Sequence, residues 1–102
     1  MPRFALTNRA VADLKSIAVY TQRNWGTKQR NEYVLALDAA LRRIAEGPAL
    51  GLPCDEITAG YRKYLQGSHL IFYKHETTTE RVLIVRVLHQ RMDVTAQFTG
   101  QE

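Results

Sequence analysis

The chain has 102 residues, 45% of them hydrophobic and 24% charged, and 14 Lys and Arg against 10 Asp and Glu give a formal net charge of +4. This composition predicts one globular domain, residues 1–102, and the mild positive charge favours an acidic partner or nucleic acid. No apolar run approaches the roughly 20 residues of a membrane span. The lone Cys54 excludes an intrachain disulfide, and the first residues lack a signal-peptide core. We therefore expect a cytoplasmic protein.

A short strand followed by a helix is predicted at the N-terminal end. Residues 3–6 form the strand candidate, and Thr7 or Asn8 can cap the following helix through a side-chain oxygen. Apolar residues then recur at helical spacing along one face. Gly26 ends this helix, because glycine tolerates the left-handed conformation that follows a helix C-terminus.

A second, longer helix is expected to begin directly afterwards. Thr27 is its predicted cap, and Gly47 and Pro48 end it, because proline cannot continue the helical hydrogen bonds. Two helices joined by so short a turn pack antiparallel. Their apolar faces still need a third surface to cover.

The second half of the chain supplies that surface as three strands. The predicted strands are residues 61–66, 70–73 and 81–88. Gly67-Ser68 is a two-residue type II′ hairpin turn, 49–59 is a loop, and 93–97 is a last short helix. The continuous apolar run in the last strand predicts a central position. The fold class is therefore α+β, with two layers: a helical hairpin packed on a small antiparallel sheet in the order β-α-α-β-β-β.

A basic cluster follows the apolar part of the last strand. Arg86, His89 and Arg91 lie within six residues, which suits an anionic partner or a catalytic centre. Since an unpaired buried guanidinium is very costly, Arg86 either lies on an open face of the sheet or pairs with a carboxylate such as Asp93 or Glu56. His89 has three open interpretations: a general base, a contact for a partner, or a hydrogen-bonded residue that closes the strand.

Two further groups complete the candidate binding surface. Along the first hairpin strand, Tyr61 and Lys63 point to one face of the sheet and Arg62 to the other. Trp25 and Tyr33 flank the interhelical turn. The predicted partner-binding residues are Trp25, Tyr33, Tyr61, Arg62, Lys63, Arg86, His89, Arg91, Met92 and Asp93. A lone cysteine and scattered histidines do not make a zinc site, so we expect no metal and no cofactor.

Five short stretches carry a family resemblance. They are Tyr20-Thr21 with Asn24-Trp25-Gly26; Gly47-Pro48 with Gly51 and Pro53; Gly60-Tyr61-Arg62-Lys63-Tyr64 leading to Gly67-Ser68-His69; Ile71-Phe72-Tyr73; and Arg86-Val87-Leu88-His89-Gln90-Arg91-Met92-Asp93. In this order, and with the predicted element order, they resemble the ParE branch of the RelE/ParE toxin superfamily over nearly the whole chain.

This resemblance implies the toxin of a type II toxin-antitoxin module. Such toxins inhibit DNA gyrase by binding and so block replication. A ParD-like antitoxin neutralises them with a C-terminal segment that folds on the toxin. The complex is expected to be a heterotetramer, to reach operator DNA only through the antitoxin, and to have no membrane partner.

Two alternatives remain open from the sequence. The RelE-like branch resembles ribosome-dependent mRNA endonucleases, whose chemistry needs a base, a cation and an acid around the phosphate. The last tyrosine here is Tyr73, inside a strand, and Leu70 stands where that branch has a hairpin arginine, so a nuclease would have to rely on His89, Arg91 and Lys63. We therefore expect no enzyme. A plain interaction module is the second alternative, and it would be harmless when expressed alone.

Overall fold

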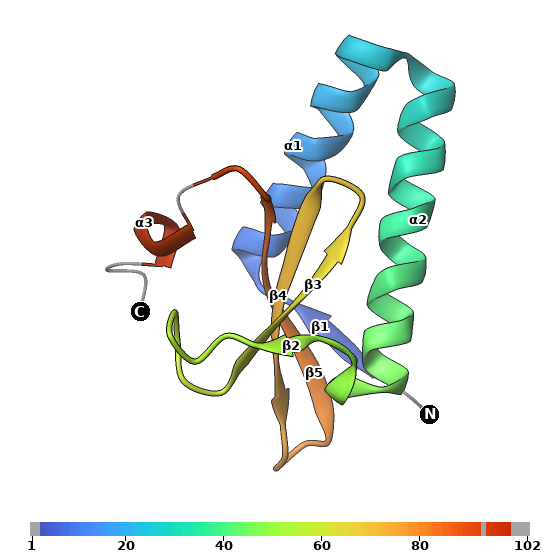
Figure 1. The fold of residues 1–102 in the computed structure, drawn as a ribbon. Helices are drawn as coiled ribbons and strands as arrows, with labels where there is room; N and C mark the ends of the chain where they lie inside the picture. The colour runs from blue at the N-terminus through green and yellow to red at the C-terminus, as the bar shows by residue number, and fades with distance from the viewer. Residues whose placement is uncertain (1–2, 93, 99–102) are drawn as a thin grey trace.

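A helical hairpin packs on a strongly twisted five-stranded sheet in this computed structural model, in which residues 3–92 and 94–98 are described (Figure 1). The helices are α1 (Asn8–Trp25), α2 (Thr27–Glu46) and α3 (Val94–Phe98), with a 3-10 turn at Pro48–Leu50. The strands are β1 (Phe4–Leu6), β2 (Leu52–Pro53), β3 (Tyr61–Gln66), β4 (His69–Glu76) and β5 (Arg81–His89). The sheet order is β1-β5-β4-β3-β2. The predicted two-layer α+β class is confirmed.

One glycine both ends α1 and begins α2. Of the two predicted caps of α1, Thr7 and Asn8, the structure selects Thr7, whose hydroxyl accepts a hydrogen bond from the Ala10 amide at 3.0 Å. Gly26 follows α1 with a φ of +94°, in the region that favours glycine, and it is also the N-cap of α2. The predicted cap by Thr27 is therefore wrong, because Thr27 is already the first residue of α2 and Gly26 alone separates the two helices.

The sheet differs from the prediction at both of its edges. β1 pairs with β5 in parallel, so the sheet is mixed, and β5 lies between β1 and β4 as its apolar sequence predicts. β2 lies inside the predicted loop 49–59 and pairs with only two residues of β3. The turn at Gly67-Ser68 is confirmed: Gly67 has a φ of +60° and Ser68 a negative φ, as a type II′ turn requires.

A bulge in β5 sets which of its side chains face the helices. Phe72 pairs with Arg86 while Tyr73 pairs with Ile84, which leaves Val85 as an extra residue. The side-chain alternation therefore shifts by one position beyond the bulge. The Thr7 hydroxyl donates to the Val85 carbonyl at 2.7 Å, so the cap of α1 also satisfies the bulged backbone.

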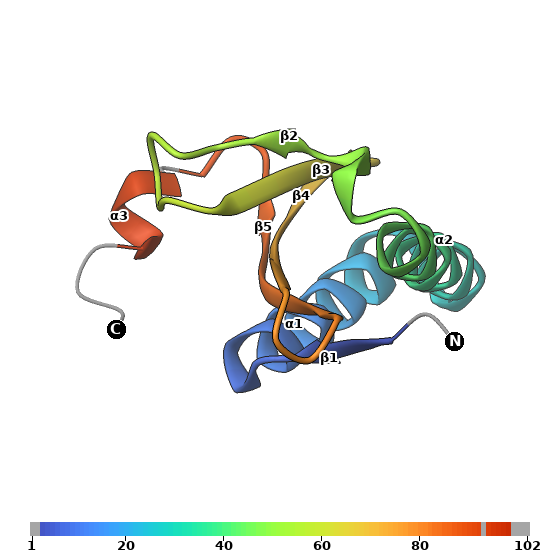
Figure 2. The same ribbon diagram turned by 90° about the horizontal axis from the view of Figure 1, so that it is seen from below.

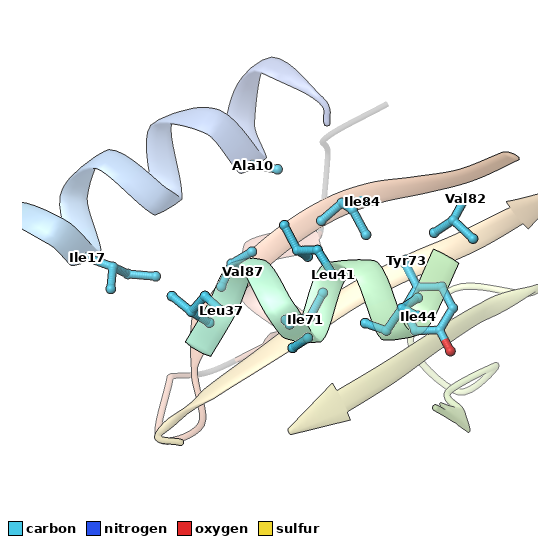
Figure 3. Close-up of a cluster of buried hydrophobic side chains, with 11 residues drawn as sticks. Ala10, Ile17, Leu37, Leu41, Ile44, Ile71, Tyr73, Val82, Ile84 and Val87 are labelled. Atoms are coloured by element: carbon cyan, nitrogen blue, oxygen red, sulfur yellow. The ribbon is translucent and has the colours of Figure 1, made fainter. Parts of the chain in front are cut away.

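Two hydrophobic clusters lie on opposite faces of the sheet. The main cluster fills the space between the helical hairpin and the sheet, where Leu37 and Ile44 of α2 meet Ile71, Tyr73 and other strand residues (Figure 3). Figure 2 shows α3 on the opposite side of the sheet from the hairpin. There Phe98 packs with Cys54, Phe72 and Leu88. Among the described residues, no helix is both long and apolar enough to cross a membrane.

Candidate functional site

Arg86 is buried and paired rather than presented to a partner. Its Nε and Nη2 donate to the two carboxylate oxygens of Asp13 on α1, at 2.8 and 3.0 Å. The same carboxylate accepts the Val87 amide at 3.0 Å. Of the two alternatives for Arg86, pairing with a carboxylate is thus confirmed, but the partner is Asp13 and not the predicted Glu56. The other predicted partner, Asp93, lies outside the described residues.

The short length of β1 explains this arrangement. β1 pairs only with residues 82–84, so the edge of β5 beyond Ile84 has no strand partner. α1 runs past that open edge, and the Asp13 carboxylate accepts the Val87 amide, which has no strand partner there. Its hydrogen bonds to the Asp13 carboxylate raise the pKa of the Arg86 guanidinium above its already high value. No local sequence signal points to Asp13, because the contact spans more than 70 residues.

Three aromatic side chains contact one another edge-on where β4 and β5 meet α2. The Tyr33 hydroxyl accepts the Ser68 amide at 3.0 Å and lies 2.6 Å from Nδ1 of His69. The His69 ring meets Tyr33 and His89 edge-on, with centroids 5.5 and 5.3 Å away. Burial, and then the neighbouring His89, lower the pKa of His69, while Asp13 opposes this shift. Nδ1 of His89 accepts the Arg91 amide at 3.1 Å.

A groove runs between α1 and the ends of β4 and β5. Its first part has a volume of about 190 Å³ and is lined by Asp13, Ser16, Ile17, Tyr20, His69, Val87, Leu88, His89 and Met92. A second part, which shares Tyr20 and His89, reaches Trp25 and Tyr33. The structure therefore brings together four predicted residues, namely Trp25, Tyr33, His89 and Met92. Sequence reasoning missed Tyr20 and His69, although Tyr20 is 64% exposed at the groove.

The three predicted residues of β3 do not join this groove. Tyr61 packs edge-on against Phe98 in the second cluster, and Lys63 lies on that same face of the sheet. Arg62 lies on the helical face, where its guanidinium donates to the Gly51 carbonyl at 2.6 Å and holds the loop after α2. The prediction that these faces alternate is confirmed.

Of the three residues available to a nuclease, Lys63 lies apart from His89 and Arg91, which are neighbours. Lys63 and His89 belong to register positions three residues apart, roughly 10 Å along the strands, and to strands that β4 separates. Lys63 faces the second cluster, whereas His89 lies on the helical face with His69. Arg91 is exposed beyond the end of β5. The described residues contain no group of three side chains placed to hold a metal ion.

Comparisons with known proteins agree with this architecture. Residues 4–94 match the family model described as the ParE toxin of the type II toxin-antitoxin system, parDE. The chain is 42% identical to Toxin ParE1 of Caulobacter vibrioides over 96 residues, covering 94% of this chain and 97% of that toxin. It is 45% identical to Toxin ParE1 of Mycobacterium tuberculosis over 92 residues, covering 90% of this chain and 93% of that toxin.

Solved structures share the fold at lower sequence identity. A chain of the chromosomal ParDE system from P. aeruginosa superposes with a TM-score of 0.73 at 15% identity, covering 87% of this chain and 96% of that one. A chain of the RelBE2 toxin-antitoxin complex from Mycobacterium tuberculosis gives a TM-score of 0.63 at 20% identity, with 88% and 100% coverage. The family model and the close relatives together show that this chain belongs to the ParE toxin family of type II toxin-antitoxin systems.

Proposed function

We propose that this chain is the toxin of its own toxin-antitoxin module, that it inhibits DNA gyrase by binding it in the cytoplasm, and that it does so without catalytic turnover. The observation that carries the proposal is the family match over residues 4–94, since gyrase inhibition is the activity that resemblance to ParE implies. The alternative is a ribosome-dependent mRNA endonuclease, and the fold that this chain shares with a RelBE2 chain is compatible with it.

The geometry of the basic residues supports binding over RNA cleavage. Cleavage by 2′-hydroxyl attack needs a base and a cation on one phosphate. Lys63 and His89 lie on opposite faces of the sheet, and the Arg86 guanidinium is already bound to Asp13. Lys63 and Arg86 therefore cannot join His89 around one phosphate without rearrangement of the sheet, and Arg91 is left as the cation next to His89.

We further propose a ParD-like antitoxin that covers an apolar face of the hairpin and an open edge of the sheet. The first is the outer face of the helical hairpin, where Val34 and Leu35 border a hollow with Ala18. The second is the outer edge of β3, because β2 pairs only with Arg62 and Lys63 and leaves residues 64–66 without a strand partner on that side. An amphipathic helix followed by an added strand would cover both regions.

Two assays run side by side test the proposed target. Purified gyrase is assayed for DNA supercoiling, and a cell-free system is assayed for translation, each with increasing amounts of the chain. We expect loss of supercoiling and unchanged translation. Loss of translation with gyrase unaffected would reverse the proposal in favour of the nuclease, and no effect on either, together with harmless expression in cells, would favour a plain interaction module.

A further inference from the structure

The two histidines of the groove are held in one tautomer. Nδ1 of His89 accepts the backbone amide of Arg91, so the neutral ring carries its proton on Nε2. The Tyr33 hydroxyl accepts the Ser68 amide and places its own proton on Nδ1 of His69, which lies much closer than the Gln66 carbonyl (2.6 against 3.4 Å). On these distances we assign His69 the same tautomer, with its proton on Nε2.

Both Nε2–H groups remain available to a partner. Neither Nε2 atom hydrogen-bonds to another described residue. In the described part of the chain, Nη1 of Arg86 is the one side-chain nitrogen or oxygen that is both buried and without a partner. The two unpartnered Nε2 atoms are therefore not buried. Both rings line the groove beside Met92 and Tyr20. Two fixed N–H donors next to apolar side chains suit an acceptor group carried by an apolar segment.

The charges around the groove favour a negative acceptor. Lys15 and Arg23 on α1 line an adjoining hollow that shares Ser16 and Tyr20 with the groove, and Arg91 is exposed just after β5. Asp13 is the one carboxylate among the described lining residues, and Arg86 and the Val87 amide occupy it. A mainly apolar hollow with few cations suits an acidic protein segment better than a nucleic-acid backbone, which needs a row of phosphate contacts.

We propose that this groove is where the toxin holds its target, through an acidic segment whose carboxylate accepts from Nε2–H of His69 and His89 and whose apolar side chain packs between Tyr20 and Met92. The inference rests on the proposed function, because it takes gyrase as that target. It assigns the target to the groove and leaves the antitoxin on the outer hairpin face and the β3 edge. His89 binds in this account and abstracts no proton.

Inhibition of purified gyrase by single variants of the chain tests this assignment. His89→Ala should weaken inhibition about tenfold through loss of a hydrogen bond to a charged group, while His89→Gln, which keeps an N–H donor near Nε2, should retain most of it. Arg23→Glu should also weaken inhibition. Arg9→Glu is the matched control, since it makes the same charge change in the first turn of the same helix, about 21 Å away. Circular dichroism confirms that each variant folds.

The outcomes separate this inference from the proposed function. If the His89→Ala and Arg23→Glu variants both inhibit gyrase as strongly as the wild type, the inference is overturned and the proposed function stands. If the wild-type chain has no effect on gyrase, the proposed function is overturned as well. If His89→Gln loses as much activity as His89→Ala, and the wild-type chain cleaves RNA, His89 acts as a general base. Loss of antitoxin binding in the groove variants, or binding of a gyrase-free DNA duplex that Arg23→Glu abolishes, would assign the groove to another partner.

Discussion

At the scale of single residues, the Asp13–Arg86 pair explains how a charged side chain is accommodated in a buried strand. The side chains of Arg86 and Asp13 are only 9% and 14% exposed, and their contact is bidentate. Such a pair contributes little relative to apolar residues of the same size, but removal of one partner leaves a buried charge uncompensated. The pair fixes α1 to β5 and so shapes the groove beside it.

Asp13→Ala should therefore lower the free energy of unfolding by about 3–5 kcal/mol. The double variant Asp13→Ala/Arg86→Met should recover much of this loss, because it removes the orphaned charge. Chemical denaturation of both proteins measures the difference, with Asp38→Ala as a control at an exposed ion pair of α2. A double variant no more stable than Asp13→Ala would show that the carboxylate acts mainly on the Val87 amide.

His69 should make stability depend on pH. Its pKa in the folded protein is lowered from the ordinary 6.5 by burial and by His89, so between these values the unfolded chain binds the extra proton. Stability should thus be complete above about pH 6.5 and fall as the pH drops through 6.5 toward the folded-state pKa. His69→Asn keeps an acceptor for Tyr33 but cannot titrate. Thermal melts from about pH 8 to about pH 5 should show a smaller fall in melting temperature for this variant than for the wild type. An equal fall in both proteins would show that His69 is not the source of the pH dependence.

At the scale of elements, local pattern predicted both long helices, the last helix and the three long strands, because periodicity and turn residues act within a few positions. β2 escaped prediction because two exposed residues carry no periodicity and depend entirely on pairing with Arg62 and Lys63. The parallel pairing of β1, the length of β4 and the bulge at Val85 depend on register between distant segments. The groove residues Asp13, Tyr20 and His69 were missed for the same reason.

The β3–β4 turn and α2 are fitted to each other through Gly67. A Cβ on Gly67 would lie 2.7 Å from the Tyr33 hydroxyl, whereas one on Gly60, at a comparably positive φ of +85°, would meet nothing within 4 Å. Gly67→Ala should cost about 1–3 kcal/mol more than the control Gly60→Ala, since both carry backbone strain but only one overpacks. Urea denaturation compares the two variants, and equal costs would mean that Tyr33 moves freely aside.

At the scale of the whole molecule, the exposed apolar side chains of the hairpin predict a toxin that is poorly soluble without its antitoxin. Val19, Trp25 and Leu35 are 48%, 70% and 68% exposed. Leu35→Glu should raise the solubility of the isolated chain and weaken antitoxin binding, while Leu50→Glu, at an exposed leucine outside the hairpin, should leave antitoxin binding unchanged. A wild-type chain that stays monodisperse at high concentration would argue against this interface.

The proposed function requires the chain to act by occupying gyrase and not by turning over a substrate. Titration of gyrase supercoiling with the purified chain tests this most directly, with messenger RNA integrity followed in a parallel translation extract. We predict that supercoiling falls in proportion to the toxin added and that full inhibition requires toxin in at least equimolar amount to gyrase. We also predict that the transcripts remain whole. Transcripts cut at defined positions by toxin far below the ribosome concentration, with gyrase still active, would contradict it.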